Sequence, residues 1–176
     1  MTNAPNFDWI TPQLAVGGRL HASHIPQLAT AHGVRAVIDL RDEDKDDEVL
    51  LLRHGVVLLH LPTPDLCGVD ATQLDRGVAF AVDRLQRRER LLIHCEHGIG
   101  RSATLALCVM VHMGHAPLDA LEHMKTRRTL ISPSPSQFEC WLAWLTRHRN
   151  RHRIAHWDLP DAHAFGMIAY RHLGAS

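Results

Sequence analysis

Residues 91–102, Leu-Leu-Ile-His-Cys-Glu-His-Gly-Ile-Gly-Arg-Ser, combine a potential nucleophile with groups suited to binding an anion. The apolar start of this stretch predicts a buried strand, and the apolar run after Ser102 predicts a helix. A helix N-terminus offers unpaired N–H groups and a positive dipole. Gly98 and Gly100 permit the positive φ values with which successive amides converge. We therefore expect a phosphate-binding cup made by Glu96, His97, Gly98, Ile99, Gly100 and Arg101.

Two side chains give this cup its chemistry. Arg101 can bind a phosphate through two parallel N–H bonds, which a lysine cannot do. Cys95 lies at the base of the cup, where the same electrostatic field favours the thiolate and makes it a nucleophile near neutral pH. A cysteine after a buried strand is usually an inert core residue. The combination of strand, cysteine, two glycines, arginine and helix start argues against that interpretation here.

The order His94, Cys95, five residues, Arg101, Ser102 resembles the motif shared by protein tyrosine and dual-specificity phosphatases, here of the small atypical dual-specificity type. The resemblance extends from about residue 9 to about residue 147. It implies cofactor-free and metal-free hydrolysis of phosphate monoesters, on phosphoproteins or small phosphate esters, through a cysteinyl-phosphate. Cys95 would attack phosphorus while Arg101 and the amides stabilise the phosphoryl oxygens. Ser102 would help the thiolate leave, and His94 would support the loop.

Two acids compete for the role of general acid, on a loop that follows a predicted strand at 56–61. Asp70 opens an Asp-x-x-Gln pattern typical of a helix cap, so it already has a structural role. Asp65 has no such role and precedes Cys95 by thirty residues, about the distance of the general acid in the resembled family. We therefore assign to Asp65 the protonation of the leaving group and the later activation of water.

Four further residues near the predicted site carry weaker assignments. Gln137 could match a glutamine that positions the hydrolytic water in tyrosine phosphatases, although a glutamine is also common at a helix start. Cys67 could form a reversible disulfide with Cys95, although an ordinary loop cysteine is the favoured interpretation. Glu96 and His97 stand where the family often has small or basic residues. Glu96 lowers the positive potential of the rim, which argues against highly phosphorylated inositol lipids.

The predicted elements form an α/β domain with a central, mainly parallel sheet of about five strands flanked by helices. Strands are predicted at 14–16, 34–40, 56–61 and 91–93, with Pro62 ending the third. Ser23 is predicted to cap a helix over 25–31, and Ser136 a helix over 137–147. The charged run 41–48 is interpreted as a solvated loop and a first helical turn, with a weaker hypothesis that it borders the active site.

The chain of 176 residues fits one core domain, and we predict a phosphatase domain at 1–147 and a His/Arg-rich C-terminal extension at 148–176. The extension is expected to be an added helix at 162–173 or to be partly disordered. A formal net charge of zero argues against nucleic acid or an anionic membrane as partner. Four scattered cysteines and the absence of a signal-peptide pattern favour a cytoplasmic location. The sequence carries no signal for oligomeric state.

Three other functions are compatible with parts of this pattern. A rhodanese-like sulfurtransferase also uses a cysteine in an amide-lined loop, but it has no need of a general acid such as Asp65. A non-catalytic phospho-binding module would usually have lost the cysteine, the arginine or the acid. A zinc site formed by His94, Cys95 and His97 lacks a second ligand pair at finger-like spacing, so we expect no metal.

Overall fold

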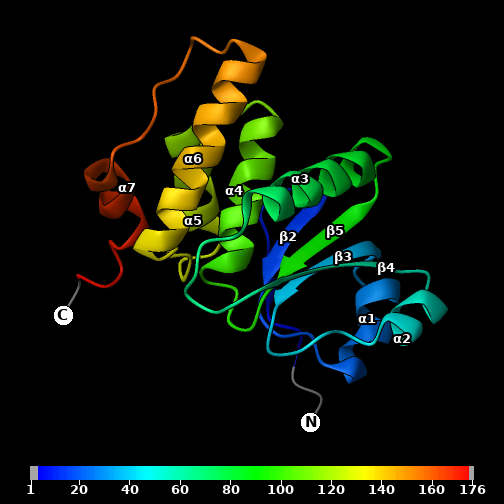
Figure 1. Ribbon diagram of the computed structural model, residues 1–176. Coiled ribbons are helices and arrows are strands. Elements are labelled where there is room, and N and C mark those ends of the chain that lie inside the picture. Colours follow the sequence, from blue (N-terminus) through cyan, green and yellow to red (C-terminus); the bar gives the residue numbers. More distant parts are fainter. Residues whose placement is uncertain (1–3, 175–176) are drawn as a thin grey trace.

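The sheet at the centre of the computed structural model, which describes residues 4–174, has the strand order β1-β2-β5-β3-β4 (Figure 1). The strands are β1 (Phe7–Trp9), β2 (Leu14–Gly17), β3 (Val34–Arg41), β4 (Val57–Thr63) and β5 (Arg90–His94). β2, β5, β3 and β4 pair in parallel, and only the pairing of β1 with β2 is antiparallel. The predicted α/β fold with a mainly parallel sheet of about five strands is therefore confirmed.

Helices cover both faces of the sheet (Figure 1). They are α1 (Ile25–Thr30), α2 (Glu48–Arg53), α3 (Ala71–Gln86), α4 (Arg101–His112), α5 (Pro117–Arg127), α6 (Pro135–His152) and α7 (Ala162–Ala169). The core between the sheet and α1 and α2 is separate from the larger core formed with α3 to α7. α4 is buried from Arg101 to Val111, as expected of a helix with apolar residues on all sides. No helix among the described residues is long and apolar enough to span a bilayer.

Three local predictions are wrong for identifiable reasons. Ser23 lies inside a short 3₁₀ turn (Ala22–His24) and does not cap α1, whose N-cap His24 makes no side-chain hydrogen bond. Pro62 continues β4, because this strand is at the edge of the sheet and needs no N–H group on its outer side. Ser134, rather than Ser136, caps α6, and it forms a reciprocal capping box with Gln137.

The C-terminal part of the chain packs against the larger core. α6 continues through residue 147 to His152, and α7 contacts α5. Trp157, Phe165 and Ala169 are buried members of that core. Residues 162–169 thus form the added helix that was one of the two expectations for this segment, although it ends before residue 173. The division of the chain at residue 147 stays a prediction.

Candidate active site

The loop between β5 and α4 is held against β2 by backbone contacts that leave no room for a side chain. Gly98 has φ of 68°, and a Cβ atom there would lie 2.5 Å from the carbonyl oxygen of Gly17. The amide of Cys95 donates to that same oxygen at 3.3 Å, and the amide of Arg19 donates to the carbonyl of Glu96 at 2.8 Å. Glycine at position 98 therefore allows the predicted cup to lie close to the end of β2.

The sulfur of Cys95 is buried at the base of this loop and receives two hydrogen-bonding groups. Its Sγ lies 3.3 Å from the Oγ of Ser102, and the amide of Gly98 donates to it at 3.3 Å. Burial opposes ionisation, but the hydroxyl and amide of Ser102, the amide of Gly98 and the charge of Arg101 outweigh it and lower the pKa of Cys95. The thiolate character predicted for Cys95 has a physical basis in these contacts.

The guanidinium of Arg101 is buried and is fixed on one side only. Its Nη1 donates to the carbonyl of Thr63 at 2.8 Å, and its two terminal nitrogens donate to the two carboxylate oxygens of Glu43 at 2.7 Å each. Its Nε is buried and has no partner among residues 4–174. A buried donor without a partner is rare, so this N–H group is available to a ligand oxygen.

The predicted general acid lies beside this arginine. The carboxylate of Asp65 is 3.3 Å from Nη2 of Arg101 and is 53% exposed, so solvent and a substrate can both reach it. Asp70 instead accepts hydrogen bonds from the amides of Thr72 and Gln73 at the start of α3. Gln73 does not complete a capping box, because its Oε1 accepts from the hydroxyl of Thr63 and its Nε2 donates to the carbonyl of Pro62. Of the two acids, Asp65 is the one close to Arg101.

Glu43 is a site residue that the sequence analysis did not identify. Its hydrogen bonds to Arg101 outweigh partial burial and lower its pKa to about 2, so the carboxylate is ionised at neutral pH. It belongs to the charged run 41–48, which borders the site as the weaker hypothesis held. The largely apolar strand that precedes Glu43 gives no sign of this contact. The only signal available was an acidic run directly after a predicted parallel strand.

Residues 42–45, 47 and 48 of this run are exposed and its end begins α2, as predicted, but two of its side chains support the loop from below. Arg41 and Asp46 are buried, and Arg41 donates to Asp39 and Asp46 at 2.9 and 2.7 Å. His94 lies 2.8 Å from Asp46 through Nε2, and its Nδ1 lies 3.3 Å from the carbonyl oxygen of Cys95. Burial opposes protonation of His94, but the hydrogen bond and charge of Asp46 outweigh it and raise the pKa of His94. His94 thus contacts the loop from below, as predicted for a supporting residue.

This network bears on the zinc hypothesis. Among the described residues, Asp39, Asp46 and His94 are the acidic and imidazole groups close enough together to share an ion. The guanidinium of Arg41 already bonds both carboxylates. His94 directs Nε2 to Asp46 rather than toward Cys95, and His97 is exposed. The three residues of the zinc hypothesis therefore do not converge on one point.

The remaining predicted residues line or support the loop. The carboxylate of Glu96 lies 3.6 Å from Arg19 and 3.7 Å from Arg41, so neighbouring cations offset its charge. The carbonyl of Ile99 accepts from the amide of Ser132 at 3.1 Å. A Cβ atom at Gly100 would lie 2.3 Å from Oε1 of Gln137, so Gln137 packs directly against the loop. Cys67 is exposed and makes no disulfide.

Comparisons with known proteins give matches in both sequence and structure. The sequence model described as Swiss Army Knife protein, DSP-PTPase phosphatase domain, matches residues 4–137. The phosphatidylglycerophosphatase and protein-tyrosine phosphatase 1 of Mus musculus is 34% identical over 64% of this chain and 62% of its own. Its Rattus norvegicus counterpart is 36% identical over 48% of this chain and 45% of its own. This chain thus spans between about half and two thirds of the length of these relatives.

Solved structures share the same fold. The crystal structure of PTPMT1 in complex with PI(5)P superposes with a TM-score of 0.78 at 24% sequence identity, over 83% of this chain and 98% of that one. The crystal structure of Tk-PTP in the active form superposes with a TM-score of 0.74 at 24% identity, over 81% of this chain and 98% of that one. At this level of identity the likeness concerns the fold alone.

Proposed function

The chain belongs to the DSP-PTPase phosphatase family, and from this membership we propose that it hydrolyses phosphate monoesters with Cys95 as the nucleophile and without a metal ion. The observation that carries the proposal is the arrangement around Cys95 and Arg101. The sulfur accepts from Gly98 at 3.3 Å, and the buried Nε of Arg101 has no partner among residues 4–174. These groups supply a thiolate and a free donor for one phosphate.

In the proposed mechanism the Cys95 thiolate attacks phosphorus in line with the leaving oxygen. The free Nε of Arg101 and the loop amides stabilise the charge on the equatorial oxygens. Asp65 gives its proton to the leaving oxygen and then takes one from the water that hydrolyses the cysteinyl-phosphate. Ser102 donates to the sulfur as it leaves, for which its hydroxyl lies within reach at 3.3 Å.

The test is hydrolysis of p-nitrophenyl phosphate in the presence of a chelator by the wild type, Cys95→Ser and Asp65→Asn. We expect no turnover in the Cys95 variant and a kcat about 10²- to 10⁴-fold lower in the Asp65 variant, which is the usual contribution of a general acid. An inactive, freshly reduced wild type that still binds a phosphopeptide would favour the phospho-binding module. Turnover of thiosulfate instead would favour the rhodanese-like alternative.

We propose phosphoproteins, carrying phosphotyrosine or phosphoserine and phosphothreonine, as the first substrate class. A lipid phosphate monoester is the second candidate, and two observations support it. The mouse and rat relatives are named for phosphatidylglycerophosphate as well as for phosphotyrosine. Leu66, next to Asp65, is 70% exposed, so an apolar side chain stands at the rim of the site. A kcat/KM for phosphatidylglycerophosphate in mixed micelles above that for a phosphotyrosine peptide would favour the lipid.

A further inference from the structure

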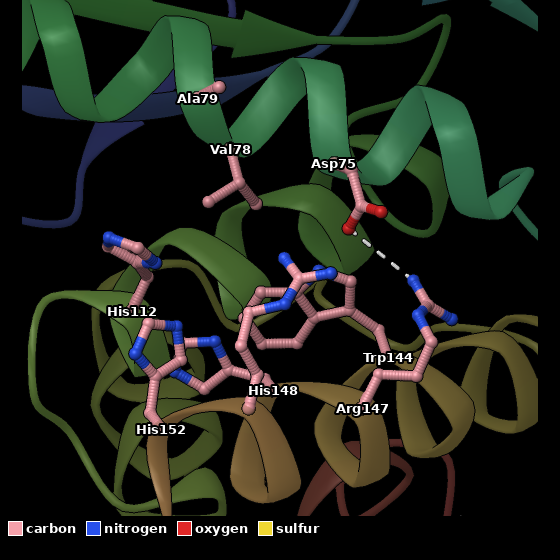
Figure 2. A pocket seen from close by; sticks show the side chains of 9 residues that line it. Asp75, Val78, Ala79, His112, Trp144, Arg147, His148 and His152 are labelled. Carbon is pink, nitrogen blue, oxygen red and sulfur yellow. Dashed lines mark hydrogen bonds and ion pairs between the residues drawn. The ribbon is translucent and has the colours of Figure 1, made fainter.

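Three histidines gather where α4 and α6 end, far from the catalytic loop. His112 is the last residue of α4, and His148 and His152 lie in the last turns of α6. Figure 2 shows their imidazoles side by side at one end of a pocket, with the ion pair of Asp75 and Arg147 at the other end. The pocket has a volume of about 150 Å³. None of the three rings has a hydrogen bond or ion pair to another group of residues 4–174.

The centroids of the three rings are spaced like those of three imidazoles on one metal ion, although their nitrogens do not lie as close together as the ligand atoms of Asp39, Asp46 and His94. His148 and His152 are four residues apart, so they share one face of α6, and His112 faces them from α4. The ring centroids are 4.5, 5.4 and 6.0 Å apart. Three imidazoles bound tetrahedrally to zinc, with Zn–N bonds of about 2 Å, have their centroids about 5 Å apart. Metal binding therefore requires that the exposed side chains of His112 and His152 rotate so that one nitrogen of each ring turns toward His148.

Electrostatics at this place favour a cation despite a nearby arginine. The C-terminal ends of α4 and α6 both point here, and each adds the partial negative charge of its last carbonyl groups. Arg151 also lines the pocket and opposes a dication, whereas Arg147 is paired with Asp75 at 3.4 Å.

We propose that His112, His148 and His152 bind one divalent transition-metal ion of the kind that imidazole prefers, represented by Zn²⁺. The fourth position of the tetrahedron faces solvent, because His112 and His152 are exposed. The ion joins the far ends of two helices whose other ends form the active site. α4 begins at Arg101, and α6 begins beside Gln137, which packs on Gly100. Eleven residues of helix separate Arg101 from His112, or roughly 16 Å, so the ion stabilises the helix pair rather than taking part in catalysis.

The test is calorimetric titration of untagged Cys95→Ser protein with ZnCl₂, since that background removes the competing catalytic thiolate. We expect one bound equivalent, and binding at least about tenfold weaker when His112→Ala or His152→Ala is added. Both residues are exposed, so neither substitution disturbs the core, and His148 stays stacked on Trp144. The matched control is His163→Ala, which removes an exposed histidine from α7 and should leave binding unchanged.

Thermal unfolding gives a second readout that does not depend on activity. At a free Zn²⁺ concentration of about 100 times Kd, Tm should rise by about 5–10 °C in the Cys95→Ser protein and return with EDTA. The rise should be lost in the His112 and His152 variants. The proposal is overturned if the protein takes up no Zn²⁺, or if the two variants bind it as tightly as the His163 control. Because the background is catalytically dead, neither result depends on the proposed phosphatase function.

Discussion

The reactivity proposed for Cys95 depends on the few groups that contact its sulfur. One of these groups is the hydroxyl of Ser102. Its Oγ lies 3.3 Å from the sulfur, and burial of Cys95 would otherwise raise the pKa of the thiol. A hydrogen bond to a charged group contributes about 1.5–3 kcal/mol. Ser102→Ala should therefore move the pH midpoint of Cys95 alkylation by iodoacetamide upward by about 1–2 pH units.

The alkylation is followed by mass spectrometry of the Cys95 peptide in a Cys67→Ser background, which removes the exposed thiol. Ser23→Ala, an exposed serine outside the site, is the control and should leave the midpoint where it is. An unchanged midpoint in Ser102→Ala would show that the amides of Gly98 and Ser102, together with Arg101, stabilise the thiolate without the hydroxyl.

Glu43 determines which face of Arg101 is free. Its two hydrogen bonds of 2.7 Å hold the terminal nitrogens and leave Nε for a phosphate oxygen. Glu43→Gln keeps the shape but removes the charge, so kcat/KM for p-nitrophenyl phosphate should fall by about 10- to 100-fold. Since the pKa of Glu43 is lowered to about 2, the wild-type pair persists as pH falls through 4.5, the usual value, and adds no step to the pH profile there.

The matched control is Glu48→Gln, which removes an exposed glutamate at the start of α2 that, within residues 4–174, forms its ion pair with Lys45. Its kcat/KM should equal that of the wild type. A kcat/KM that rises in Glu43→Gln would mean that Glu43 competes with phosphate for Arg101 instead of orienting it.

The site contains two kinds of residue: those whose contacts are local in the sequence and those whose contacts are distant in the sequence. Cys95, Arg101 and Ser102 lie on one loop and one helix start, so local spacing was enough to predict their proximity. Glu43 reaches Arg101 across 58 positions of sequence. An acidic run is usually a solvated surface, and nothing in the run distinguishes Glu43 from its acidic neighbours. Such a contact depends on which strands are adjacent, which a single sequence does not specify.

Among the elements, the segment 41–48 supports the site through its two buried side chains, Arg41 and Asp46. Asp46 accepts from Arg41 at 2.7 Å and lies 2.8 Å from Nε2 of His94, and all three side chains are buried. Asp46→Asn leaves the buried side chains of Arg41 and His94 with one charged partner fewer, and the loss of a buried charged partner typically costs roughly 3–5 kcal/mol. We expect the free energy of unfolding, measured with urea, to fall by that amount.

The pH dependence of this effect has a definite sign. Asp46 raises the pKa of His94 in the folded chain, although burial opposes it. The stabilisation from His94 is therefore complete below 6.5, its unfolded value, and is lost as pH rises through the raised pKa. The difference between wild type and Asp46→Asn should shrink over that range. A difference that is constant with pH would contradict the assigned pairing.

At the scale of elements, hydrophobic patterns predicted the parallel strands. They did not predict the features of the two edge strands, which depend on position in the sheet. β3 and β5 are central, and their apolar runs identified them directly. β1, at one edge, has only three residues and no alternation long enough to predict it. β4 lies at the other edge, where Pro62 is tolerated. Edge position is a property of the assembled sheet, so the sequence of the strand alone could not indicate it.

For the molecule as a whole, the segment after α6 completes the larger core, although the family match ends before this segment begins. The match ends at residue 137, two residues into α6, yet Phe165 of α7 packs on Phe138 with ring centroids 4.5 Å apart. Lys125 of α5 donates to the carbonyl of Ala169 at 2.7 Å, which ties the end of α7 to the same core. Gln137, which packs on Gly100 of the catalytic loop, is the residue before Phe138. Because Phe165 packs on Phe138, α7 supports the start of α6 and, through it, the active site.

Phe165→Ala tests how much the folded chain depends on this last helix. Phe165 is 2% exposed and also lies 6.0 Å from Trp141, so its removal leaves a cavity between α6 and α7. Such a cavity should lower the free energy of unfolding, measured with urea, by about 3–5 kcal/mol. Met167→Ala is the control on the same helix, because Met167 is 65% exposed and should change stability by less than about 0.5 kcal/mol. If the two variants were equally stable, α7 would be an attachment to the phosphatase domain instead of part of its core.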